Sequence, residues 1–198
     1  QASKQIARRF LMMKGNVKYL GLILLIAVLI SGCNLFGKKE NKLIMLSVGK
    51  KYELSSNIVK HNTYGDPNDT KLTDGIWGDK TNASDVTWSG AMPEDREKND
   101  LCFYIIDLEK VEQIGSVKVQ AFQQSDWGIV IPPQITVAVS EDKSTWDEPI
   151  VVNKTPNTEL QTVEEFYDFT VGKAGRYVKV TIKPHHTWFW LGEIAVLK

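Results

Sequence analysis

From about Ile44 onward, apolar and polar residues alternate in short runs. In Ile114–Phe122 every second residue is apolar, which is the period of a strand with one buried face. Similar or continuous apolar runs occur at Leu101–Leu108, Gln134–Ser140, Phe166–Val171, Tyr177–Ile182 and Gly192–Leu197. We expect no amphipathic helix of ten or more residues after Cys33. The pattern therefore predicts an all-β domain, an antiparallel sandwich or jelly roll.

The N-terminal region has a different pattern. A short basic segment precedes about a dozen apolar residues, Tyr19–Ile30, which is the layout of an export signal and is short for a membrane span. The run ends at Ser31-Gly32-Cys33, and Leu29–Cys33 resembles the lipobox of bacterial lipoproteins. That resemblance implies cleavage before Cys33 and a lipid on its thiol. The alternative is an uncleaved signal anchor with an incidental cysteine.

These features divide the chain into three parts. We expect residues 1–32 to be a signal peptide with a short N-terminal remnant, residues 33–45 to be the lipidated cysteine and a polar tether, and residues 46–198 to be one folded domain. The lipid would hold the protein on the extracytoplasmic face of the cell membrane.

Removing the signal changes the charge. The chain has 24 basic and 24 acidic residues, and residues 1–32 hold five of the basic ones and no acidic one. The remaining 166 residues then carry 19 basic against 24 acidic residues, a net charge of −5. A nucleic-acid partner is not expected, because such proteins need a basic face. Cys102, in an apolar run, is predicted to be a buried thiol.

Seven short phrases follow one another along the folded part of the chain: Leu72–Gly75, Trp77-Gly78, Trp88–Gly90, Ile106–Ile114, Ile135–Trp146, Gly175–Val180 and Trp190–Val196. Together and in this order they resemble the discoidin domain, also called the coagulation-factor 5/8 type C domain, in its bacterial form, carbohydrate-binding module family 32. Glu109 stands where the family usually has glycine.

The resemblance implies a galactose-binding-like jelly roll of about eight main antiparallel strands, with ligand loops at one end. It also implies a structural calcium ion near the residues that match the family positions, Asp74 and Glu193. Calcium takes six to eight oxygen ligands, so carbonyls of the loop from Leu72 to Thr81 would have to contribute. The alternative is that Asp74 caps a turn while Glu193 pairs with Arg176 or a lysine.

A sugar ring offers an apolar face and a rim of hydroxyl groups, which suit an aromatic side chain and fixed polar groups. Large aromatics in expected loops are therefore candidates for ligand binding. The candidates are Tyr64, Trp127, His185, His186 and Trp188. The other aromatics are expected to pack in the core or at the base of loops: Trp77, Trp88, Phe103, Phe122, Phe169 and Trp190. Zinc at His185-His186 is not expected, because adjacent strand residues point to opposite faces.

No motif of a hydrolase, metalloprotease or phosphate-binding loop occurs, so we do not expect an enzyme. The prediction is a membrane-anchored, non-catalytic binding module for carbohydrate. The alternative is a protein-interaction or assembly subunit of an envelope complex, and phospholipid binding by the apolar segment Trp127–Ile131 is a third option.

Overall fold

The computed structural model describes residues 43–198. The predicted signal peptide, its cleavage site and Cys33 lie outside the described residues. Within the described range no helix is long and apolar enough to cross a membrane. Helical structure there consists of two 3-10 turns, η2 (Lys71–Thr73) and η3 (Ser125–Trp127).

Eight strands make up the rest of the regular structure. They form an antiparallel sheet in the order β2-β3-β8-β4-β7-β5-β6, and β1 pairs with β4 outside this path. The strands are β1 (Tyr52–Leu54), β2 (Ile58–Lys60), β3 (Ser89–Pro93), β4 (Cys102–Gln124), β5 (Gln134–Ser140), β6 (Ile150–Asn153), β7 (Thr162–Lys183) and β8 (Phe189–Leu197). The predicted all-β jelly-roll class is confirmed.

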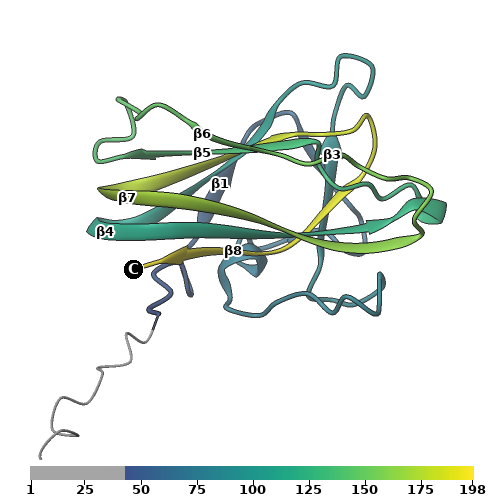
Figure 1. Cartoon of the computed structure of the whole chain (residues 1–198), viewed down its shortest axis with the longest axis horizontal. Helices are drawn as coiled ribbons and strands as arrows, with labels where there is room; N and C mark the ends of the chain where they lie inside the picture. Colours follow the sequence, from purple (N-terminus) through teal and green to yellow (C-terminus); the bar gives the residue numbers. More distant parts are fainter. Residues whose placement is uncertain (1–42) are drawn as a thin grey trace, which may run out of the picture. The chain divides into compact units, whose positions relative to one another are not determined.

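The two long strands β4 and β7 run side by side through the domain (Figure 1). Their pairing shifts register between Asp107 and Glu112, and the first half of β4 pairs with β1 while the second half pairs with β8. The sheet therefore folds over into two layers at this corner. The sequence predicted two strands within each of β4 and β7; each pair proves to be one continuous strand, because backbone pairing continues around the bend.

The core lies between the two layers. It is formed by the alternate residues of β4, β7, β5 and β8, such as Tyr104, Val119, Val180 and Ile194, all with at most 1% of their surface exposed. Burying a side chain of this size contributes about 1.5–3 kcal/mol. Cys102 is buried in the same core, and burial, followed by the charge of Asp100, raises the pKa of its thiol to about 11.

A second, smaller apolar cluster lies apart from this core. It consists of Ala83, Trp88, Phe122, Ile129 and Trp190, with Tyr64 and Trp188 packed against it. The predicted burial of Trp88, Phe122, Phe169 and Trp190 is confirmed. For two other aromatics the prediction was wrong. Trp77 is 37% exposed, with its ring near Phe166, and Phe103 is half-buried on the outer side of β4, below the Lys179 ammonium.

The first described residues lie beside the C-terminal end of β8. Leu46 N donates to Val196 O (2.7 Å) and Lys198 N donates to Ile44 O (2.9 Å). The C-terminus lies at the left in Figure 1, and β8 runs from there to the loops at the other end. Nine strand residues span about 30 Å. The chain therefore enters the domain at the end opposite the connections that follow β4 and precede β8.

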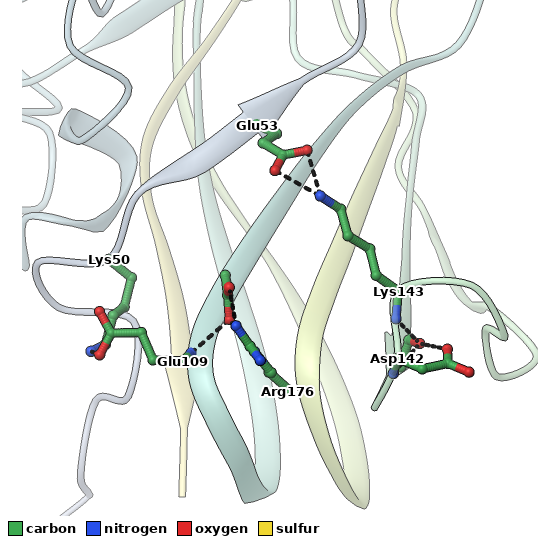
Figure 2. Close-up of polar contacts among 8 residues, drawn as sticks. Lys50, Glu53, Glu109, Asp142, Lys143 and Arg176 are labelled. Atoms are coloured by element: carbon green, nitrogen blue, oxygen red, sulfur yellow. Dashed lines mark hydrogen bonds and ion pairs between the residues drawn. The ribbon is translucent and has the colours of Figure 1, made fainter.

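The end where the chain enters carries several ion pairs (Figure 2). Glu109 accepts from Lys50 Nζ (2.6 Å), and Lys143 Nζ lies 2.7 Å from both oxygens of Glu53. The guanidinium of Arg176 binds both oxygens of the Asp107 carboxylate at 2.8 Å. Exposed pairs of this kind each contribute about 1 kcal/mol or less. Because Arg176 is paired with Asp107, the expected alternative in which it pairs with Glu193 is wrong.

Candidate functional site

Three side chains from two distant segments meet at the loop end of the domain, and we call His61, Tyr64 and Trp188 the loop-end site. His61 and Tyr64 belong to the loop after β2, and Trp188 directly precedes β8. The His61 and Trp188 ring centroids are 4.9 Å apart, and those of His61 and Tyr64 are 5.2 Å apart. Trp190 lies beneath, 5.1 Å from Tyr64 and only 2% exposed. The three upper rings are half-buried, so each keeps part of its surface open.

The His61 ring is held in one orientation. Its Nδ1 accepts hydrogen bonds from the backbone N–H groups of Thr63 and Tyr64, both at 3.2 Å. Because Nδ1 accepts, the neutral imidazole must carry its proton on Nε2. His61 therefore presents a fixed hydrogen-bond donor between two aromatic rings.

A pocket of about 290 Å³ lies beside this histidine. It is lined by Lys60, His61, Asn62, Thr63, Gly65, Asp66 and Pro67. Five of these side chains offer charged or hydrogen-bonding groups, and the pocket opens to solvent. Its volume is close to the lower end of the range of ligand pockets, about 300–1,000 Å³.

Asp66 fixes the shape of this loop. Its carboxylate is 3% exposed and accepts from Tyr52 Oη, from Asn68 N (3.0 Å), from Thr70 N (2.7 Å) and from Lys71 N. Burial acts to raise the pKa of Asp66, but these hydrogen bonds outweigh it and the pKa is lowered. Burial, and then Asp66 itself, raises the pKa of Tyr52, so the phenol keeps its proton and donates it.

Trp127 lies on the loop next to Trp188. It ends the turn η3, and Gly128 follows in the left-handed conformation (φ 70°). The two loops are joined because Thr187 Oγ1 donates to Gly128 O (2.6 Å) and Val130 N donates to Trp188 O (3.0 Å). The Trp127 side chain is 54% exposed, which leaves its ring free to contact a ligand.

The predicted pair His185 and His186 lies on the other side of the same connection. His186 N donates to Asn99 Oδ1 (3.0 Å), and His186 Nδ1 lies 2.8 Å from Arg96 O. The imidazole of His186 thus fastens this loop to residues 94–100, while both histidine side chains remain exposed. Of the five predicted residues, the structure brings Tyr64 and Trp188 into one cluster, and places Trp127 on the joined loop.

His61 was not among the predicted ligand-binding residues. The available signal was its place at the start of the polar loop His61–Pro67 that carries Tyr64. Its partner Trp188 is far away in sequence, and only the pairing of β3 with β8 brings them together.

The two predicted calcium ligands lie close together. Glu193 is fully buried on β8, and Gly75 N donates to its Oε2 at 3.2 Å. Its Oε1 has no hydrogen-bond partner among residues 43–198. Burial raises the pKa of Glu193 to about 8, the Gly75 hydrogen bond opposes this, and the nearby charge of Asp74 adds to it. Asp74 Oδ1 accepts from Ile76 N (2.7 Å), so the expected alternative in which Asp74 caps a turn is confirmed. The unpartnered Glu193 Oε1, near the Asp74 carboxylate, still fits a cation site.

Other oxygens of the following loop are already engaged. Asp79 Oδ1 accepts from Thr81 N (2.8 Å), and the backbone oxygens of Asp79 and Asn82 both accept from Trp88 Nε1 at 3.1 Å. In residues 43–198 no three His, Cys, Asp or Glu side chains are grouped for metal binding. A cation between Asp74 and Glu193 would therefore need backbone carbonyls as further ligands.

A second pocket, of about 280 Å³, lies at the opposite corner, around the β5–β6 connection. Its lining is Val139, Ser140, Glu141, Asp142, Thr145, Asp147 and Ala174. The backbone N–H groups of Thr145 and Ser144, and the Ser140 hydroxyl, lower the pKa of Asp142 to about 2. Asp142 therefore serves to close this turn, and no aromatic ring lines the pocket.

Solved structures share this arrangement of strands. The lectin domain of lectinolysin complexed with Lewis B antigen is 19% identical, with 77% of this chain and 95% of that domain covered and a TM-score of 0.50. A histidine mutant of the lectinolysin domain complexed with Lewis b gives 18% identity, 78% and 96% coverage and a TM-score of 0.52.

A selenomethionine-labelled variant of chitosan-binding module 1, from a chitosanase/glucanase of Paenibacillus sp. IK-5, is 15% identical, with 78% and 98% coverage and a TM-score of 0.50. The chain has the fold of these modules. No protein-family model matches the sequence, and no curated protein matches it. The resemblance to the discoidin-type jelly roll is thus confirmed at the level of the fold.

Proposed function

We propose that this chain is a non-catalytic binding module for glycans, with the loop-end site and Trp127 as its contact surface. The observation that carries the proposal is the His61 ring, held between Tyr64 and Trp188 with its Nε2–H left as a donor. The complexes of the lectinolysin domain with Lewis antigens support the proposal, because that domain has the same fold.

The chemistry of the site suits a sugar ring. The C–H face of a pyranose packs on an aromatic ring, and its hydroxyl oxygens accept hydrogen bonds from fixed donors. His61 supplies such a donor, and Asn62 and Thr63 add polar groups in the pocket beside it. Rings already fixed by packing lose little conformational entropy on binding, which favours affinity.

The proposal includes attachment to a membrane through lipid on Cys33, on the extracytoplasmic face. The position of Leu43 supports this part, because the chain enters the domain about one strand length away from the loop-end site. Loops at that distance are free to meet a glycan outside the cell. Many anchored copies would raise the avidity of a weak single site.

We also propose that Asp74 and Glu193 hold a structural calcium ion. The unpartnered Glu193 Oε1 supports this, since a buried polar oxygen is costly unless a cation or a donor compensates it. The ion would fix the loop that follows Asp74 and would take no part in chemistry.

A glycan array tests the proposed function. The full chain in detergent should be retained by a defined set of glycans, including Lewis b and chitosan oligomers, and Trp188→Ala should lose that retention while keeping the β-rich circular dichroism spectrum. Full binding by a folded Trp188→Ala variant would contradict the site. Absence of glycan binding together with a stoichiometric protein partner, captured from detergent extracts through Trp127, would favour an envelope-complex subunit instead.

A further inference from the structure

The proposed calcium residues and the loop-end site are connected by a short stretch of chain, residues 61–74. His61 and Tyr64 begin it, Asp66 lies near its middle, and η2 leads directly into Asp74. Asn68, Thr70 and Lys71 all donate backbone hydrogen bonds to the Asp66 carboxylate. If binding at Asp74 restricts the chain there, these hydrogen bonds would also restrict the loop that carries His61 and Tyr64.

Lys71 connects the two regions through its side chain as well. Its ammonium donates to Gly65 O (3.3 Å) and to Trp88 O (3.0 Å). Gly65 is next to Tyr64 in the site, and Trp88 ends the loop that starts at Asp74. Burial lowers the pKa of this lysine, although the nearby carboxylates, Asp66 foremost, oppose the effect.

A second route passes beneath the site. After Gly75, the loop is fixed to β4 because Gly78 N donates to Gln120 Oε1 (2.7 Å) and Gln120 Nε2 donates to Gly78 O (3.0 Å). The loop ends at Trp88, whose ring is fully buried in the same cluster as Trp190. Tyr64 rests on Trp190, with 5.1 Å between ring centroids. The floor of the loop-end site is thus built partly from the calcium loop.

We propose that a divalent cation bound by Asp74 and Glu193 orders the loop-end site, so that cation and glycan bind with positive coupling. The inference rests on the proposed calcium site and on the proposed glycan site. Without a cation, the buried Glu193 Oε1 has no partner among the described residues. A cation bound there and at Asp74 would give this oxygen a partner and restrict the loop from Asp74 to Trp88.

Restricting that loop also restricts its partners Lys71, Gly65 and Trp190. When a glycan binds afterwards, the protein then loses less conformational entropy. This smaller entropy loss gives positive coupling between the two ligands without a change of structure. Coupling of this kind typically amounts to about 5- to 150-fold in affinity, and it is reciprocal. We expect calcium to strengthen glycan binding at least fivefold, and glycan to strengthen calcium binding by the same factor.

Hydrogen exchange with calcium alone tests the inference without a known glycan. Amide exchange of the full chain is compared in EDTA, in calcium chloride and in magnesium chloride. Calcium should slow exchange by fivefold or more in residues 61–66 and 86–90, as well as in 72–78. The β5–β6 connection, residues 141–149, lies at the opposite corner and should not change.

Three substitutions identify the route. Asp74→Asn, at an exposed position, should remove the effect of calcium everywhere, and Glu193→Gln should do the same if it folds. Asp66→Asn should keep the calcium protection of residues 72–78 and lose that of residues 61–65, because Asp66 acts only by positioning the loop. Protection confined to 72–78 in the unsubstituted chain would overturn the coupling and leave the calcium site intact.

Absence of any calcium effect would overturn both the calcium site and the coupling. The glycan array would still test the proposed glycan function independently, since that experiment requires no cation.

Discussion

The imidazole of His61 lies edge-on against the indole of Trp188, with 4.9 Å between the ring centroids and 66° between the ring planes. The two residues come from a loop after β2 and a loop before β8, and the pairing of β3 with β8 brings these loops together. His61 thereby has aromatic neighbours on two sides and a fixed tautomer. These contacts fix the orientation of the His61 ring within the loop after β2.

The two nitrogen atoms of His61 have separable roles, which a pair of substitutions can distinguish. His61→Asn places an acceptor near the Nδ1 position and removes the Nε2 donor. We expect the fold to be kept and glycan affinity to fall about fivefold, the value of one neutral hydrogen bond of about 1 kcal/mol. His61→Gln places a donor near the Nε2 position and leaves Thr63 N and Tyr64 N without their acceptor.

His61→Gln should therefore lower the free energy of unfolding by about 1 kcal/mol while it keeps more of the affinity than His61→Asn does. Titration calorimetry on a glycan retained by the array, together with urea unfolding, provides both numbers. The opposite ranking of the two variants in affinity would show that Nε2 does not contact the ligand.

Trp127 is predicted to contribute to ligand affinity and not to the stability of the fold. Its ring is 54% exposed, so Trp127→Ala should change the free energy of unfolding by less than about 0.5 kcal/mol. Anchoring tryptophans in binding sites contribute about 2 kcal/mol or more, so affinity should fall roughly thirtyfold. Trp146, half-buried in the connection between β5 and β6 at the opposite end of the domain, is the control for affinity. Equal losses for Trp127→Ala and Trp146→Ala would mean that the effect does not come from the loop end.

The fold was predictable from sequence to a larger extent than the site. Alternation such as Val117, Val119 and Ala121 depends only on which face of a strand is buried, and these residues are indeed in the core. The continuity of β4 across Asp107–Glu112 was missed because polar residues there mark a bend, which resembles a turn in sequence. The His61–Trp188 pair was missed because contacts between distant loops leave no periodic signal, although Trp188 alone was recognised.

Glu109, at the position where the discoidin-type sequence pattern has glycine, has φ 70°. A non-glycine residue in this left-handed conformation costs about 1–2 kcal/mol, and the exposed ion pair with Lys50 (2.6 Å; Figure 2) offsets at most about 1 kcal/mol. We predict that Glu109→Gly leaves stability nearly unchanged, whereas Glu109→Ala lowers it by about 1 kcal/mol.

Lys110, the next residue, has an ordinary φ and provides the reverse control. There glycine should be less stable than alanine by about 0.5–1 kcal/mol. Thermal unfolding of the four variants checks both orders. If Glu109→Ala is as stable as Glu109→Gly, the left-handed conformation of this residue is not a source of strain.

Calcium is predicted to stabilise the domain. For a dissociation constant near 10 µM, 1 mM calcium is about 100-fold in excess and should add about 2.7 kcal/mol, which raises Tm by roughly 5–10 °C. Asp74→Asn should unfold at the same temperature with calcium and with EDTA. Differential scanning calorimetry in the two buffers provides the comparison, and an unchanged Tm for the unsubstituted chain would rule out the ion.

The lowered pKa of Asp66 predicts how the stability of the domain changes at acidic pH. Its pKa is lowered in the folded state, so the folded state holds the carboxylate more firmly ionised than the unfolded state, in which the pKa is about 3.9. Such a group stabilises the fold above the unfolded pKa, and this contribution disappears as pH falls through the folded value. The free energy of unfolding should therefore decline below about pH 5, and the loop from His61 to Lys71 should be affected first.

Asp66→Asn should lower the stability at pH 7 by about 2–3 kcal/mol, because an amide cannot accept all four hydrogen bonds and would set its own donors against the backbone N–H groups. It should also flatten the decline between pH 5 and pH 3, since the titrating group is gone. Asp168→Asn, at an exposed position on β7, serves as the control and should leave both quantities nearly unchanged. Urea unfolding at several pH values measures the slope directly. The free energy of unfolding could instead decline equally steeply in the unsubstituted chain and in Asp66→Asn. That result would show that other carboxylates govern acid unfolding, and that the Asp66 hydrogen bonds do not contribute to the pH dependence.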